Sequence, residues 1–137
     1  MLASFNPAEI PRYSVIRAPI ALPGSGDTET QKLFVTLLHR DAHVVCFKTT
    51  SQLAFYRNNP EVAAGCVFYP AGKLTFFPKD TAIQSNNIWP VHYSKLTDPA
   101  QVLGRLPDDF GAMLVRAVQN AVDLDPVWKK AILKEIT

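Results

Sequence analysis

The sequence has few of the residues that mark a metal centre, a disulfide framework or a phosphate-binding glycine loop. It holds two cysteines, three histidines and six glycines among 137 residues. Cys46 and Cys66 lie in apolar surroundings without a CxxC spacing, so we expect two buried, reduced thiols. The histidines lack the spacing of metal ligands, and the glycines are not followed by Gly-Lys-Thr. The sequence therefore predicts neither a metal site nor a cofactor.

The chain also lacks a long apolar run and a strong excess of one charge. No apolar segment approaches the roughly 20 residues of a membrane-spanning helix. Residues 1–7 do not have the charged and apolar regions of a signal peptide, so we expect a cytoplasmic protein without a membrane partner. A net charge of +2 argues against binding nucleic acid over the whole surface, but it leaves a local basic patch open.

What the chain does have is an ordinary globular composition with many prolines. Hydrophobic residues make up 47% and charged residues 19% of a chain long enough for one domain with a buried core. The eleven prolines fall mainly between apolar runs, which indicates many short elements separated by turns. Residues 21–31 are rich in loop formers, and we expect a mobile loop there.

Short β-branched and aromatic runs predict the strands. Residues 11–20 predict a first strand, which Pro19 weakens at its end. Residues 33–38 and 44–48 predict a hairpin closed by a polar turn, and Ser51 is expected to cap a short helix that ends near Arg57. Further strands are expected over residues 66–69, 74–77, 81–84 and 89–93, the first two forming a second hairpin.

The C-terminal part of the chain changes to helical spacing. Apolar residues between positions 110 and 121 recur at intervals of three and four, with Asp108 or Asp109 as the cap. Asp125 followed by Pro126 predicts the start of a last helix. We therefore expect one α+β domain over residues 1–137. In it, a small antiparallel SH3-like β-barrel over residues 11–96 precedes a helical extension over residues 108–136.

The clearest chemical signal lies at the open ends of the first predicted hairpin. Lys32 opens its first strand, and Thr50 and Ser51 follow its second strand. In an antiparallel pair these two ends meet. A cation beside hydroxyl donors is a set of groups that can hold a phosphate, so this end of the hairpin is the candidate site.

The order of elements and the strand-end residues resemble the PemK/MazF family, the toxins of bacterial toxin–antitoxin pairs. The segment Lys-Leu-Phe-Val at 32–35 is similar to the basic opening of a family strand. The segment Lys-Thr-Thr-Ser-Gln at 48–52 is similar to the Thr-Thr or Thr-Ser ending of the next strand, and residues 72–84 look like the closing strands. The resemblance covers about residues 11–96. It departs from the family in having Lys32 in place of an arginine, without the proline that follows.

The resemblance implies a metal-independent endoribonuclease that cuts single-stranded RNA by attack of the RNA's own 2′-hydroxyl. Lys32 would stabilise charge on the phosphorane, and Thr50 would orient the scissile phosphate. The resemblance further implies an antitoxin protein as partner, a homodimer and no cofactor. Candidates for substrate binding are Ser51, Gln52, Lys48, Arg40 and His39.

A second function is compatible with the same sequence. The missing arginine and the long helical C-terminus favour a non-catalytic SH3-like barrel that acts as a protein-interaction or dimerisation module. Its binding surface would be a groove of the barrel or the apolar stripe of residues 110–136. A fold alone does not decide between an enzyme and an interaction module.

Overall fold

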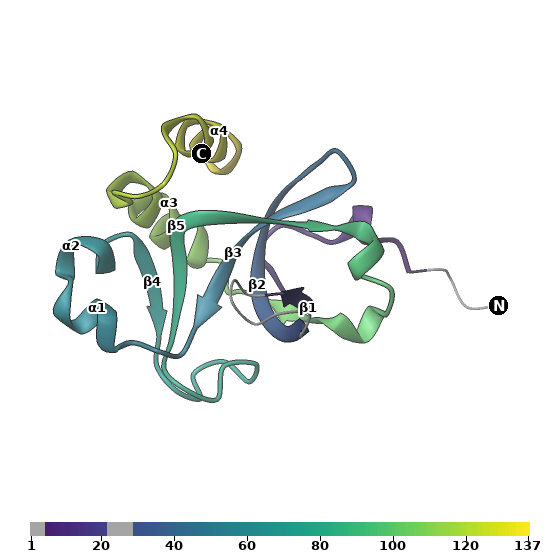
Figure 1. The fold of residues 1–137 in the computed structure, drawn as a ribbon, viewed down its shortest axis with the longest axis horizontal. Coiled ribbons are helices and arrows are strands. Elements are labelled where there is room, and N and C mark those ends of the chain that lie inside the picture. The colour runs from purple at the N-terminus through teal and green to yellow at the C-terminus, as the bar shows by residue number, and fades with distance from the viewer. Residues whose placement is uncertain (1–4, 22–28) are drawn as a thin grey trace.

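The computed structural model describes residues 5–21 and 29–137, and it confirms the α+β class. Six antiparallel strands form one sheet in the order β4-β5-β3-β2-β1-β6, and the helices α3 and α4 lie together beside it (Figure 1). The strands are β1 (Ser14–Ala21), β2 (Glu29–Arg40), β3 (His43–Thr50), β4 (Cys66–Tyr69), β5 (Thr81–His92) and β6 (Val102–Arg105). The α-helices are α1 (Ala54–Asn58), α2 (Pro60–Ala63), α3 (Phe110–Asn120) and α4 (Pro126–Ile136), and three 3-10 helices span Pro7–Glu9, Tyr93–Lys95 and Pro99–Gln101.

The sheet does not close into the predicted barrel. Its edges are β4 and β6, and no pairing joins these two strands among the described residues. Strand β6, which the sequence analysis missed, pairs with the beginning of β1. The second half of β1, which contains Pro19, pairs with β2 alone in the part of the chain that the structure describes. This position is compatible with a residue that has no N–H to donate.

Strands β2 and β3 form the predicted first hairpin. Asp41 and Ala42 connect them, with φ angles of 51° and 60°. Positive φ at both central residues is the mark of a type I′ turn, whose twist matches that of the flanking strands. The hairpin places Phe34 opposite Lys48. Of the loop expected over residues 21–31, residues 22–28 lie outside the described part of the chain and 29–31 belong to β2.

The predicted second hairpin is wrong. Strand β4 pairs with β5, and residues 70–80 form a loop that is closed by its own hydrogen bonds. Gly72, with φ of 76°, donates its N–H to the carbonyl oxygen of Phe77 at 3.0 Å. The N–H of Ala71 donates to the Asp80 carboxylate at 2.7 Å. These bonds satisfy backbone groups that a strand pairing would otherwise have used.

The two short strands predicted near residues 81–84 and 89–93 are parts of the single strand β5. Its pairing with β3 jumps from Ile88 opposite Phe47 to Gln84 opposite Lys48. Residues 85–87 therefore form a bulge within a continuous strand. The expected interruption at these polar residues is real, but it bends the strand instead of ending it.

Of the predicted N-caps, the one of α4 agrees best with the structure. The Asp125 side chain accepts the N–H of Val127 at 2.8 Å, which confirms the predicted cap. Asp109 holds the N-cap position of α3, without a side-chain hydrogen bond there. The prediction that Ser51 caps a helix is wrong, because Leu53 occupies the N-cap position of α1. No helix among the described residues is long and apolar enough to cross a membrane.

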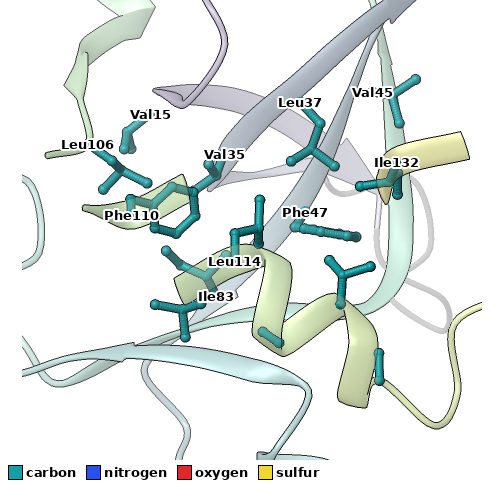
Figure 2. Close-up of a cluster of buried hydrophobic side chains, with 14 of the residues drawn as sticks. Val15, Val35, Leu37, Val45, Phe47, Ile83, Leu106, Phe110, Leu114 and Ile132 are labelled. Atoms are coloured by element: carbon teal, nitrogen blue, oxygen red, sulfur yellow. The ribbon is translucent and has the colours of Figure 1, made fainter. Parts of the chain in front are cut away.

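The main hydrophobic core lies between one face of the sheet and the helices α3 and α4. Figure 2 shows side chains of the sheet, such as Leu37 and Phe47, facing Phe110 and Leu114 of α3 and Ile132 of α4. All of these side chains are fully buried. Most of the apolar stripe predicted over residues 110–136 therefore packs within the chain itself, while Val122 and Val127 remain exposed.

A second buried cluster lies on the opposite face of the sheet and includes Phe34 and Cys46. Successive residues of a strand point to opposite faces. Lys32 is therefore on the same face as Phe34, and Lys48 is on the same face as Cys46. The two cysteines are buried free thiols as predicted, and burial raises the pKa of the Cys46 thiol.

Candidate functional site

The candidate site lies where the sheet separates between two of its strands. Among the described residues, the pairing of β2 with β3 ends at Phe34 opposite Lys48. Beyond this point β2 continues beside β1, and β3 continues beside β5. The hydroxyl of Thr49 donates across the gap to the carbonyl oxygen of Leu33 at 3.0 Å. The separation leaves room for a cleft between the open ends of the hairpin.

A cleft with a volume of about 260 Å³ occupies this position. The ends of β2 and β3 supply one part of its wall, and the loop before β5 supplies the other part. The structure thus brings together five of the residues that the sequence analysis named for the site. These are Lys32, Lys48, Thr50, Ser51 and Gln52.

The cleft is positively charged. Lys32, Lys48 and Lys79 line it, and its described lining contains no acidic residue. None of these three lysines forms a salt bridge with another described residue. Burial lowers the pKa of Lys48, and the charge of Lys32 lowers it further. Unpaired cations around a cleft attract an anionic ligand.

Thr50 presents a free hydroxyl donor in this cleft. Its Oγ1 atom accepts the N–H of Gln52 at 3.1 Å, and its hydroxyl hydrogen has no acceptor among the described residues. A threonine hydroxyl can accept and donate at the same time, so Thr50 can still donate to a phosphate oxygen. The neighbouring Thr49 already donates to the strand backbone, and its hydroxyl has a structural role.

Arg40 and His39 do not line this cleft, which corrects the set of candidate residues. Both lie at the turn end of β2, whereas Lys32 lies toward the other end of the same strand. The Arg40 guanidinium carbon is 4.8 Å from the ring centroid of Trp128 in α4. The two ring nitrogens of His39 lie 2.7 Å from the Tyr93 hydroxyl and 2.9 Å from the carbonyl oxygen of Ile10.

Further residues reach the cleft from the loop before β5, among them Phe76 and Lys79. The sequence analysis missed Lys79, which carries no motif that could have identified it. The Phe76 ring packs edge-on against the buried ring of Phe77, with 4.9 Å between the centroids. On another side it faces Gly104 of β6, where a Cβ atom would lie 3.0 Å from the Phe76 ring. Only the folded loop brings these side chains to the site.

The chemistry of this cleft fits an anion. Its described lining offers ammonium groups, hydroxyls and an amide, and no group of three or more His, Cys, Asp or Glu residues suited to a metal ion occurs in residues 5–21 and 29–137. Neither a family model nor a curated protein matches this sequence significantly, so the PemK/MazF resemblance stays a prediction.

Proposed function

We propose that this protein is a metal-independent endoribonuclease that holds the backbone of single-stranded RNA in the lysine-lined cleft. The observation that carries the proposal is the position of Lys32, Lys48 and Thr50 around one cleft without an acidic residue in its described lining. RNA supplies its own nucleophile in the 2′-hydroxyl. The protein then has to align the ribose with the phosphate and stabilise the developing charge, for which cations and a hydroxyl donor suffice.

In the proposed reaction the 2′-oxygen forms a bond to phosphorus, and the bond from phosphorus to the 5′-oxygen breaks. The products carry a 2′,3′-cyclic phosphate and a 5′-hydroxyl. The neutral amine of Lys48 accepts the proton of the 2′-hydroxyl, and water protonates the departing 5′-oxygen. The lowered pKa of Lys48 supports this role, because it makes the neutral amine more available. Lys32 and the Thr50 hydroxyl stabilise the phosphorane oxygens.

The test is incubation of the purified protein with a long single-stranded RNA in EDTA. Two variants accompany the wild type: Lys32→Ala, and Lys130→Ala as a matched loss of one exposed lysine on α4. We expect discrete cleavage by the wild type and Lys130→Ala, and cleavage at least about 10-fold slower by Lys32→Ala. Intact RNA in every reaction would contradict the enzyme. Equal cleavage by all three proteins would contradict the role of Lys32.

The interaction module is the weaker candidate. The apolar stripe, one of the two surfaces considered for it, is largely buried, because Phe110, Leu114 and Ile132 are fully covered and Val127 is exposed. The partners that the resemblance implies, an antitoxin protein and a second copy of this chain, stay predictions.

A further inference from the structure

A second cleft, with a volume of about 410 Å³, adjoins the lysine-lined cleft and shares Lys48, Thr50 and Gln52 with it. The rest of its described lining is different in kind, because aromatic and amide side chains replace the two other lysines of the first cleft, and one carboxylate, Asp123, also lines it. A strand of RNA whose phosphate lies in the first cleft would place a neighbouring group of the same nucleotide here. The residues that line this second cleft therefore indicate which part of the nucleotide binds beside that phosphate.

Two aromatic side chains of the second cleft are accessible. Phe55 is 57% exposed, although its size would favour burial, and Trp89 is partly exposed. The Lys48 ammonium lies 5.5 Å from the ring centroid of Trp89. Exposed aromatic rings beside a cation in a groove are how proteins hold unpaired nucleobases, with the bases stacked on the rings and the backbone near the charge.

Two amide side chains of β5 line the same cleft, and each has a carbonyl oxygen that accepts no hydrogen bond from the described residues. The Oε1 atom of Gln84 and the Oδ1 atom of Asn86 are buried and have no hydrogen-bond partner among the described residues. Asn86 is only 8% exposed. The Gln84 amide is held in place, because its Nε2 atom donates to the Tyr56 hydroxyl at 2.5 Å. Both oxygens are shielded from solvent, and the Oδ1 atom of Asn86 lies beside Gly65. A buried carbonyl oxygen without a donor is destabilising, and a donor on a ligand would remove that penalty when the amide turns toward the cleft.

We infer that the second cleft is a nucleobase subsite that prefers a base with an exocyclic amino group. The inference rests on the proposed function and names the part of the RNA that this site reads. The base stacks on Phe55, the Gln84 and Asn86 amides turn toward the cleft, and the amino group of the base donates to their carbonyl oxygens. Adenine, cytosine and guanine carry such a donor, whereas uracil has no exocyclic amino group and offers only its ring N3–H.

The experiment measures fluorescence anisotropy of labelled octamers of A, C and U with the full chain in EDTA. The octamers carry 2′-O-methyl groups, which removes the nucleophile and prevents cleavage during the titration. We expect the wild type to bind the A and C octamers at least about 5-fold more tightly than the U octamer. The thermal transition of Asn86→Leu verifies that this variant is folded. We expect it to bind the A and C octamers more weakly and the U octamer as the wild type does, so the difference in affinity between them becomes smaller.

The stacking role has a matched control in Phe68. Phe55 and Phe68 both pack edge-on against the Tyr56 ring, with centroids 5.4 and 6.0 Å away, and both are exposed. Only Phe55 of the two lines the second cleft. We expect Phe55→Ala to weaken binding of the A octamer about 5- to 100-fold, and Phe68→Ala to leave it unchanged.

The possible failures are distinguishable. Equal affinity for the three octamers, or equal affinity of Phe55→Ala and Phe68→Ala, would overturn the subsite. In both cases, weaker binding by Lys32→Ala than by the wild type would show that the first cleft still holds the RNA backbone. Absence of binding to every octamer would overturn the subsite and the proposed function together.

Discussion

The charge of Lys32 lowers the pKa of Lys48 across the point where β2 and β3 separate. Burial is the larger cause of this lowering, and the neighbouring cation is the second. The described lining of the cleft gives neither lysine an acidic partner. A bound phosphate would relieve the repulsion between them, so the pair favours an anion over an empty cleft.

The first prediction concerns this coupling and does not depend on any enzymatic activity. A nearby positive charge disfavours the ammonium form, so its removal in Lys32→Ala should raise the pKa of Lys48. The pKa should stay below that of an exposed lysine, because the effect of burial remains. An NMR titration of the lysine Cε signals measures this shift. Lys130→Ala is the control, and an unchanged Lys48 titration in Lys32→Ala would show that the two groups are not coupled.

The second prediction is the pH dependence of RNA cleavage. The neutral amine of Lys48 is the proposed proton acceptor, so the rate should rise with pH and level off above the pKa of Lys48. Arginine keeps its proton over the pH range of the assay, so the cleavage rate of Lys48→Arg should not rise with pH in this way. Lys32→Ala should shift the rise to higher pH. Initial rates between about pH 6 and pH 10 test this, and an identical profile for Lys48→Arg would exclude Lys48 as the acceptor.

The third prediction separates two adjacent threonines. Thr50→Val should slow cleavage about 10-fold or more, because the free donor to the phosphate is lost. Thr49→Val should instead lower the free energy of unfolding by about 1–2 kcal/mol, because the carbonyl oxygen of Leu33 loses its donor. Cleavage rates and urea denaturation of both variants make the comparison. A larger loss of cleavage in Thr49→Val would reverse the assignment of the two hydroxyls.

The fourth prediction concerns the hairpin turn. Ala42 has a φ of 60°, a conformation that glycine adopts without steric strain. Ala42→Gly should therefore raise the free energy of unfolding by about 0.5–1 kcal/mol. The control is Ala112→Gly in the exposed part of α3, which should lower it by about 1 kcal/mol. Destabilisation by Ala42→Gly in a thermal or urea transition would contradict this account of the turn.

The fifth prediction concerns the C-terminal helices. Leu114 is fully buried against the sheet, and Leu114→Ala should lower the free energy of unfolding by about 2–5 kcal/mol. Removal of residues 107–137 should abolish cooperative folding, because it exposes Leu37 and Phe47 together. Circular dichroism during urea denaturation measures both effects. A truncated chain that unfolds cooperatively with the stability of the full chain would show that the helices are an independent extension.

Local sequence patterns were enough for the elements whose partners are close in the chain. The first hairpin follows from two apolar runs and a short polar turn, and α4 follows from Asp125 before a proline. Strand β6 and the pairing of β4 with β5 could not be predicted in this way. The partner of β6 lies far away in the sequence. Strands β4 and β5 are consecutive, but the apolar run at 74–77 between them predicts a strand until the loop's own hydrogen bonds are known.

The sequence by itself determined which side chains meet at the open end of the hairpin. The short turn of this hairpin sets which residues of β2 and β3 lie opposite each other, so the sequence alone places Lys32 and Thr50 near each other. Only the tertiary structure decided that β2 and β3 separate at this point, because β2 follows β1 while β3 follows β5. It also decided that Lys79 joins the cleft and that Arg40 does not, since long-range packing fixes where a loop folds and which end of a strand faces the site.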